Sequence, residues 1–490
     1  MPIPDNDHSN LPMLGEALYE RLAEHYRRVI AAGTLVPGDR MPSMRAFMSQ
    51  HRVSLSTAVQ TFRRLESAGL LFAKPRSGYF VKRPTKSKLP NVREPEIEAV
   101  PMPARFVGLH ERISGVIERA HRFPDALNLG GATAAAGLYP SAHLKSLAIK
   151  TLRHRPTLLT EAGPMEGAVE FRQAVAKRLL SCGVSTSQDE VIVTNGGVEA
   201  VNLALRAVAQ PGDTIAIESP AFFGLLQILE SLGLRALEIP TSPTTGLSIE
   251  ALEIALTAYK NVKAVVVVAN LQNPLGCSMP DERKAMLVSL CAHHGVAVIE
   301  DDPYRELIAS AASTKPVKAW DRAGGVIYCS SLNKVLAPGM RLGWVSSGRW
   351  HERVKMLKFA QSRHNETLPQ LVAAQFINSG AFDRHLHQLR EKLGAQREAM
   401  SNAIAHYFPH ETRMSQPSGG LLLWVALPND AHSEALFDAA LREGIRVAPG
   451  TIFSNSSGFD SFVRLSCPRP FDEVMETAVR RLGQLVEASS

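Results

Sequence analysis

The sequence lacks the features of a membrane protein and of a disulfide-bonded secreted protein. None of its apolar runs approaches the length that a membrane-spanning helix needs. The first residues, MPIPDNDHSN, are acidic and polar, unlike a secretory signal. Only five of the 490 residues are cysteine, and the absence of a CxxC pair argues against a disulfide framework or a zinc site. We therefore expect a cytoplasmic protein without a bound metal.

Charged residues make up only 21% of the chain, and the net charge of +7 is unevenly distributed. Residues 1–90 contain 14 Lys and Arg against 7 Asp and Glu, whereas the remainder contains 40 of each kind. A basic head on a neutral body is typical of a protein that binds a polyanion. On charge alone, a basic domain without such a partner explains the pattern equally well. The length of the chain favours two or three domains.

The pattern at the start of the chain predicts three helices followed by a hairpin. Residues 14–30 carry apolar side chains at helical spacing. Ser43 follows a Pro-Gly turn and is expected to cap a second helix, and Ser54 or Ser56 is expected to cap a third. Residues 70–81, LLFAKPRSGYFV, suit two short strands around a turn. This order predicts a winged helix-turn-helix.

Polar and basic side chains around the third helix suit contacts with double-stranded DNA. Small hydroxyl side chains at a helix start can approach base edges in the major groove. Arginines nearby can bind phosphates, although each one alone is more often a solvated surface charge. We predict a DNA-binding domain over residues 12–83, with contacts from Arg45, Ser54, Ser56, Thr57, Arg63 and Arg76.

This segment resembles the GntR family of bacterial regulators. The matching stretches are LYERL, GTLVPGDRMPSMRAF, VSLSTAVQTFRRLESAGLL and PRSGYFV, in the order and spacing of the family. The resemblance implies that Arg45 contacts DNA and that Gly78 is the glycine of the wing. Leu55 departs from the pattern, because the family usually has arginine after the serine that opens the recognition helix.

A change of composition separates this domain from a larger body. Residues 84–105 contain five prolines and few aliphatic residues, which predicts a semi-rigid, extended linker. Residues 106–490 alternate short β-branched runs with amphipathic helices. This alternation predicts an α/β fold with a doubly wound, mostly parallel sheet, and such sheets bind ligands at the carboxyl ends of their strands.

Residues suited to ligand binding directly follow five of the predicted strands. Each has an ordinary structural explanation, such as a tight turn, a core aromatic residue or a solvated charge. The residues are Gly197 and Val198 after VIVT, Phe222 after TIAIE, Asn273 after AVVVVA, Asp301 and Tyr304 after VAVIE, and the stretch SSLNKVLAPGMRLGW after VIYC.

Pyridoxal phosphate (PLP) is one ligand that accounts for all of these residues. Its aldehyde needs an amine, which Lys334 can supply. Its phosphate needs a fork of donors and helix amides, which Arg341 and residues 197–198 can supply. The ring needs a carboxylate at its nitrogen, donors at its hydroxyl group and a stacking partner. We assign these roles to Asp301, to Asn273 and Tyr304, and to Phe222.

From about residue 120 onward, the sequence resembles the fold-type I aminotransferases. The matching stretches include FRQAVAKRLL, TNGGVEAV, NPLG, EDDPY, SSLNK with APGMRLGW, PSGGLLLW and VRLSC. The resemblance implies a PLP-binding body over residues 106–490, with a large part at about 145–365 and a smaller α+β part formed by the remainder.

The same resemblance assigns individual roles. It implies that Lys334 is the catalytic lysine that forms the Schiff base, that Ser331 and Arg341 bind the phosphate, and that Arg464 holds the carboxylate of an amino-acid ligand. Two departures stand out. Asn333 occupies a position where many relatives have Ser or Thr, although it can still donate a hydrogen bond. The segment TEAGPMEG lacks a tyrosine that many relatives supply to the partner subunit.

A GntR-like head joined to an aminotransferase-like body resembles the MocR subgroup of transcriptional regulators. The resemblance implies a homodimer that binds PLP and DNA, and that responds to an amino acid or amine through aldimine exchange at Lys334. The alternative is an active aminotransferase with a DNA-binding head, in which Lys334 also transfers the α-proton of the substrate. A third hypothesis is a structural remnant that binds no cofactor.

Overall fold

A computed structural model describes residues 18–31, 34–35, 38–67, 70–74, 78–81, 89–98, 102–309, 315–428 and 431–488. The chain divides into two units between Lys88 and Leu89. Within the described ranges, no helix combines the length and the apolar character that crossing a membrane requires.

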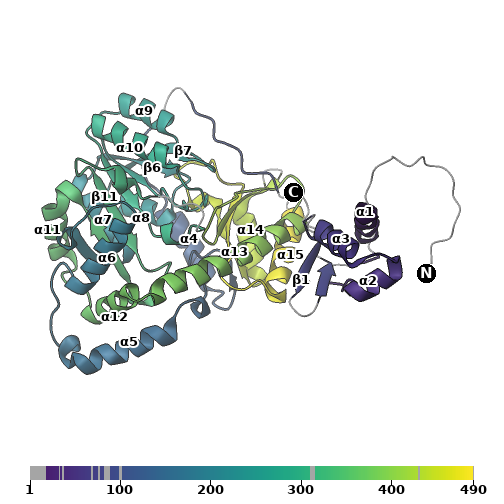
Figure 1. Ribbon diagram of the computed structural model, residues 1–490. Helices are drawn as coiled ribbons and strands as arrows, with labels where there is room; N and C mark the ends of the chain where they lie inside the picture. Colours follow the sequence, from purple (N-terminus) through teal and green to yellow (C-terminus); the bar gives the residue numbers. More distant parts are fainter. Residues whose placement is uncertain are drawn as a thin grey trace. The chain divides into compact units, whose positions relative to one another are not determined.

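Among its described residues, the first unit contains three helices and a two-stranded wing (Figure 1). Ser43 Oγ accepts a hydrogen bond from the Ala46 amide at 3.2 Å, and Ser54 Oγ accepts one from the Thr57 amide at 3.3 Å, so both serines cap helices. The predicted winged helix-turn-helix is therefore confirmed. Its elements are α1 (Leu18–Ala31), α2 (Met44–His51), α3 (Leu55–Ser67) and the antiparallel strands β1 (Leu71–Lys74) and β2 (Gly78–Val81).

Aromatic side chains form the core of this unit. Phe47 and Phe62 are fully buried, with ring centroids 4.9 Å apart, and Tyr26 packs against Phe47 at 5.5 Å. Leu65 is also buried, one helical turn after Phe62. The apolar face of α3 thus points inward, while the first residues of α3 stay at the surface.

The body is built on a nine-stranded sheet. Its order is β3-β7-β6-β9-β10-β11-β12-β5, and β8 pairs with β7. The strands are β3 (Arg105–Phe106), β5 (Val191–Asn195), β6 (Thr214–Ser219), β7 (Arg235–Ser242), β8 (Gly246–Leu247), β9 (Val262–Val267), β10 (Ala297–Asp301), β11 (Val326–Ser331) and β12 (Leu342–Ser346).

The sheet is mixed, although most of its strands run parallel. Strands β7, β6, β9, β10 and β11 are mutually parallel, and β12 is antiparallel to both β11 and β5. Only the residues between Ser331 and Leu342 connect β11 to β12, which is too short for the helical crossover that a parallel return needs. The predicted mostly parallel, doubly wound α/β fold is confirmed, with β12 and the short strands β3 and β8 running antiparallel to their neighbours.

Alternate residues of the strands pack against helices on the two faces of the sheet. Ile215 and Ile217 belong to the core beneath α7 and α8, whereas Ala216, between them, belongs to the core beneath α9 and α10. The helices of this part are α5 (Ser141–His154), α6 (Val169–Ser181), α7 (Gly196–Val208), α8 (Phe223–Ser231), α9 (Ile249–Ala258), α10 (Asp281–His293), α11 (His351–Gln361) and α12 (Thr367–Asn378).

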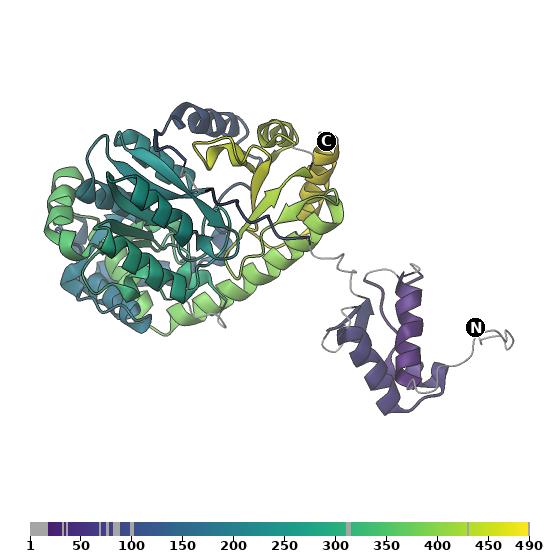
Figure 2. The same ribbon diagram turned by 90° about the horizontal axis from the view of Figure 1, so that it is seen from above.

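A smaller antiparallel sheet, ordered β13-β14-β17-β16, forms the second part of the body. Figure 2 shows the long green helix α13 running from the large sheet to this smaller yellow-green sheet. The elements are α4 (His110–His121), α13 (Ala381–Tyr407), α14 (Ser433–Arg442), α15 (Glu473–Ala488), β13 (Arg413–Met414), β14 (Leu422–Ala426), β16 (Ala448–Pro449), β17 (Phe462–Ser466), and the parallel pair β4 (Leu127–Asn128) and β15 (Ile445–Arg446).

Much of the segment predicted as a linker, residues 84–105, is part of the body. Leu89 and Val92 are buried in its core, and the Met414 amide donates a hydrogen bond to the Pro90 carbonyl at 3.0 Å. These two aliphatic residues anchor an otherwise irregular stretch, which explains why composition alone did not distinguish it from a free linker. The boundary between the two units, between Lys88 and Leu89, falls inside the predicted linker of residues 84–105.

Candidate functional site

A cavity of about 170 Å³ lies at the carboxyl ends of β6, β9 and β10, beside the start of α7. Apolar side chains such as Leu225, Ile228 and Val266 form much of its wall. All ten residues that the sequence predicted as cofactor ligands line it: Gly197, Val198, Phe222, Asn273, Asp301, Tyr304, Ser331, Asn333, Lys334 and Arg341. The structure thus brings together residues from five separate strand ends.

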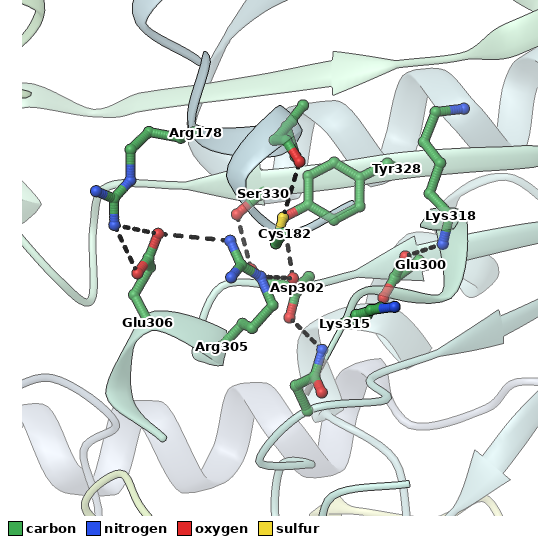
Figure 3. A network of polar contacts seen from close by, with 12 residues as sticks. Arg178, Cys182, Glu300, Asp302, Arg305, Glu306, Lys315, Lys318, Tyr328 and Ser330 are labelled. Carbon is green, nitrogen blue, oxygen red and sulfur yellow. Dashed lines mark hydrogen bonds and ion pairs between the residues drawn. The ribbon is translucent and has the colours of Figure 1, made fainter. Parts of the chain in front are cut away.

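The two consecutive carboxylates after β10 have different surroundings. Asp301 lines the cavity, whereas Asp302 does not and is buried in a polar network (Figure 3). Asp302 accepts hydrogen bonds from Tyr328 Oη at 2.9 Å, Arg305 Nε at 3.0 Å and Asn270 Nδ2 at 3.1 Å. Adjacent residues at a strand end point in opposite directions, so only one of the pair is available to a ligand.

The polar network continues from Arg305 to two helices. Arg305 contacts Glu306, whose carboxylate oxygens each accept a hydrogen bond from Arg178 of α6 at 3.0 Å (Figure 3). Arg178 also binds Asp383 of α13 at 2.6 Å, and Arg390 of α13 donates to the Glu306 carbonyl at 2.7 Å. The short helical turn that follows Tyr304 is therefore fixed to both α6 and α13.

Lys334 and Asp301 have opposite shifts in pKa. Burial lowers the pKa of Lys334 to about 8, with further lowering by Arg464 and Arg341 and opposition from Asp301. Burial raises the pKa of Asp301 to about 7, reinforced by Asp302 and opposed by Lys334. At pH 7 about a tenth of the Lys334 amine is consequently unprotonated, far more than for an exposed lysine, and this is the form that attacks a carbonyl carbon.

Glycine at position 196 permits Asn333 and Arg341 to approach the start of α7. Gly196 has φ +77°, and a Cβ there would lie 2.8 Å from Asn333 Nδ2 and 3.5 Å from Arg341 Nη2. Arg341 is exposed at the edge of the cavity and donates to the Asn195 carbonyl at 3.1 Å. A Cβ at Gly343 would overlap the backbone of Gly196. Two glycines thus allow strand β12 and the helix start to pack closely.

Arg464 is a buried cation beside the cavity. It is 2% exposed, donates to Asn273 Oδ1 at 2.7 Å and to the Gly130 carbonyl, and stacks over the ring of Phe453 at 5.0 Å. No carboxylate of the described residues pairs with it. Burial lowers its pKa to about 10, with Tyr304 opposing. A buried guanidinium without an anionic partner favours binding of an anionic ligand group.

Sequence reasoning missed two polar residues at this site. Thr133 Oγ1 accepts a hydrogen bond from Lys334 Nζ at 3.2 Å, but its surroundings, GGATAAAGLY, show no recognisable motif. Glu218 lines the cavity, and burial raises its pKa to about 8. Its Oε2 accepts from the Val268 amide at 3.0 Å, whereas Oε1 has no partner among the described residues. A carboxylate at the end of a buried strand was the available signal for Glu218.

The predicted DNA contacts lie on α2, α3 and the wing. Arg45 is exposed in the first turn of α2, and Arg63 is exposed on α3. Gly78 begins β2 with φ +99°, a conformation that glycine adopts readily. The hydroxyl groups at the start of α3 contact one another, with Ser54 Oγ 2.8 Å from Ser56 Oγ and 3.0 Å from Thr57 Oγ1. Arg76 lies outside the described residues.

Comparison with known proteins identifies both parts of the chain. The family "Aminotransferase class I and II" matches residues 133–482, and "Bacterial regulatory proteins, gntR family" matches residues 18–81. The uncharacterized HTH-type transcriptional regulator YdcR of Escherichia coli is 35% identical over 96% of this chain and 99% of its own length.

Two solved aminotransferases resemble the body. The kynurenine aminotransferase of Pyrococcus horikoshii, solved in complex with PMP, is 26% identical over 78% of this chain and 94% of its own, with a TM-score of 0.71. LysN of Thermus thermophilus, an α-aminoadipate aminotransferase solved with N-(5'-phosphopyridoxyl)-L-leucine, is 27% identical over 77% of this chain and 97% of its own, with a TM-score of 0.70. The chain therefore belongs to the MocR subgroup of GntR-family transcriptional regulators, in which a DNA-binding helix-turn-helix domain is fused to an aminotransferase-like body.

Proposed function

We propose that this protein binds PLP at Lys334 and regulates transcription in response to an amino acid or amine. The observation that supports this most directly is the convergence of ten predicted ligands on one cavity, in a chain that also has a GntR-family head. The proposal includes a homodimer whose two heads bind two DNA half-sites.

The donors around the cavity fit the parts of PLP. Hydroxyl, amide and guanidinium donors gather beside the start of α7, which suits a phosphate dianion. The Asp301 carboxylate suits a protonated pyridine nitrogen, and Asn273 and Tyr304 suit the ring hydroxyl group. A Cβ at Gly197 would lie 3.6 Å from Asp301 Oδ1 and 3.8 Å from Ser331 Oγ, so the missing side chain keeps this part of the cavity open.

Each residue has a distinct task in this proposal. When bound, PLP supplies a carbonyl carbon that amines attack and a ring that withdraws electrons from that carbon. Lys334 supplies the amine of the protein, and Asp301 keeps the ring nitrogen protonated. Arg464 binds the carboxylate of an incoming amino acid, whose amine competes with Lys334 for the same carbon. The ligand regulates DNA binding because it has different affinities for two conformations of the protein.

A homodimer is consistent with the surface at the cavity. Val198 lines the cavity and is 50% exposed. Apolar side chains at the rim of a binding site are suitable for burial by a second subunit. The measured mass in solution tests this part of the proposal.

Transamination is a second candidate function, favoured by the state of Lys334. Its lowered pKa leaves an amine that can accept and return a proton near neutral pH. Lys334 would move this proton between the α-carbon of the substrate and the carbonyl-derived carbon of the cofactor. Steady formation of a keto acid from an amino acid and a keto-acid acceptor supports this function, and a single stoichiometric exchange without turnover supports regulation alone.

The main experiment tests PLP binding and DNA binding in two separate assays. Purified protein is incubated with PLP and reduced with borohydride, and mass spectrometry of the peptides locates the added mass. We expect the label on Lys334 and no label in Lys334→Ala. Binding to the DNA upstream of the protein's own coding region is measured with and without PLP. Labelling at another lysine contradicts the cofactor assignment, and an absence of salt-sensitive DNA binding contradicts the regulatory assignment.

A further inference from the structure

We propose that Thr133 is a positioning residue that holds the Lys334 amine whenever this amine is not bonded to the cofactor, and so helps to set the pH range in which Lys334 captures PLP. This inference rests on the proposed function, because it concerns the same lysine. It adds a residue that neither the strand-end pattern nor the family resemblance identified.

The contact between the two residues joins distant segments of the chain. Lys334 Nζ donates to Thr133 Oγ1 at 3.2 Å, across 201 positions of sequence. Among the described residues, Thr133 Oγ1 is the one hydrogen-bond partner of this amine. Thr133 is half-buried, and Ala132 beside it lines the cavity. The hydroxyl group is thus placed where an incoming ligand and the lysine both come close.

The segment that carries Thr133 is fixed to the strand that carries Arg464. The Leu129 carbonyl accepts hydrogen bonds from the amide of Ser466 at 2.7 Å and from its Oγ at 3.0 Å. The Gly130 carbonyl accepts from Arg464 Nη2. A Cβ at Gly130 would lie 2.6 Å from the Val447 backbone, so the loop packs tightly against the smaller sheet. Thr133 and Arg464 therefore belong to one rigid local structure, while Lys334 follows the large sheet.

The other groups that face Lys334 are charged or aromatic. Arg464 from β17 and Arg341 after the β11 turn lower its pKa, and Asp301 from β10 raises it. The Tyr304 ring lies 5.8 Å from Nζ, and the Tyr139 hydroxyl donates to the Lys334 carbonyl at 3.5 Å. Two cations therefore lower the pKa of Lys334 and one carboxylate raises it. Thr133 differs from these groups because it is a neutral hydrogen-bond acceptor.

A neutral acceptor favours the protonated lysine, because an ammonium group donates a stronger hydrogen bond than an amine does. Removal of the Thr133 hydroxyl should therefore lower the pKa of Lys334 still further. It should also leave the amine without a fixed direction, which slows attack on the carbonyl carbon. The two effects are separable, because the first shifts the midpoint of a pH profile and the second lowers its plateau.

The test measures the rate of PLP capture by the full-length apoprotein between pH 6 and pH 10. Absorbance follows the reaction, and borohydride trapping confirms that the product is on Lys334. The wild-type midpoint is expected at about 8. Thr133→Val should move the midpoint down by about one pH unit, because the hydrogen bond to Thr133 stabilises the protonated amine more than the neutral amine. Its plateau should fall several-fold.

Three further variants complete the experiment. Thr133→Ser keeps the hydroxyl and should restore the wild-type profile, and Thr133→Ala removes it without adding bulk should the valine variant fail to fold. Thr151→Val is the matched control, since Thr151 is 5% exposed and accepts one hydrogen bond from Gln375 Nε2 at 2.9 Å. Thermal unfolding confirms that each variant is folded.

The outcomes separate the two proposals. A lowered midpoint in the valine or alanine variant, with recovery in Thr133→Ser, supports the role of Thr133. An unchanged or raised midpoint in these variants, when wild type captures PLP on Lys334, overturns that role and leaves the cofactor assignment standing. Failure of wild-type protein to capture PLP at any pH overturns both.

Discussion

Replacing Arg464 by methionine should abolish amino-acid recognition without unfolding the protein. In the folded state, burial lowers the pKa of Arg464 from its ordinary value to about 10, so its charge opposes folding at every pH below about 10. This lowering corresponds to about 3 kcal/mol at neutral pH. Methionine removes this cost, but leaves Asn273 Oδ1 and the Gly130 carbonyl without a donor, at about 1–3 kcal/mol each. The opposing effects are similar, so the stability of the ligand-free protein should change little.

In contrast to the stability of the ligand-free protein, the affinity of this variant for an amino acid should fall strongly. Loss of one partner from a buried, hydrogen-bonded charge pair costs about 2–5 kcal/mol, which corresponds to roughly 30-fold to 5,000-fold in affinity. The assay titrates the PLP-loaded protein with amino acids and follows its absorbance. Each amino acid is paired with the amine that lacks its carboxylate, such as leucine with isoamylamine. Arg464→Met should lower the affinity for the amino acid and leave the affinity for the amine unchanged.

Arg397→Met provides the matched control. Arg397 is another arginine whose pKa is lowered by burial, and it donates to the Gly420 carbonyl at 2.7 Å. Gly420 does not line the cavity, whereas Asn273, the partner of Arg464, does. This variant should bind amino acids as wild type does. The carboxylate assignment is wrong if Arg464→Met binds an amino acid as tightly as Arg397→Met. It is also wrong if Arg464→Met loses the amine and the amino acid equally.

Three further changes address stability, packing and DNA. The raised pKa of Glu218 contributes stability to the apoprotein that is fully present below about pH 4.5 and is lost as pH rises through about 8. Glu218→Gln should therefore reduce the change in the free energy of unfolding between pH 5 and pH 8.5 by up to about 4 kcal/mol, measured by chemical denaturation. Gly343→Ala should displace the backbone of Gly196 and lower the retention of PLP on dialysis at least tenfold. Unaltered retention would show that PLP binding does not require the close packing of Gly343 against Gly196. Arg45→Ala should weaken DNA binding in fluorescence anisotropy and reduce the salt slope by about one; an unchanged slope would exclude a phosphate contact.

The sequence predicted those parts of the site that depend on local order along the chain. Residues that follow parallel strands reach the same edge of the sheet, so Phe222, Asn273 and Asp301 could be brought together from strand order alone. The consecutive carboxylates could not be separated in this way. Alternation of side-chain direction places Asp301 at the cavity and Asp302 against Tyr328 and Arg305.

Long-range packing determines what the sequence did not predict. The contact of Thr133 with Lys334 depends on how the segment after β4 binds the smaller sheet, and the composition of that segment contains no sign of it. Similarly, burial of Leu89 and Val92 makes part of an apparent linker into body structure. In both cases a few tertiary contacts decide the outcome, and their partners lie hundreds of residues away.

The arrangement also suggests how events at Lys334 could reach the rest of the body. Asp301 and Tyr304 flank Asp302, whose network passes through Arg305 and Glu306 to α6 and α13. Helix α13 continues to the smaller sheet, which carries Arg464 and holds the Thr133 segment. Under the proposed function, a ligand that occupies Arg464 and releases Lys334 would act on both ends of this set of contacts. Because regulation requires only that these contacts differ between two states, it needs no turnover, and a single exchange of amines at one carbon is sufficient.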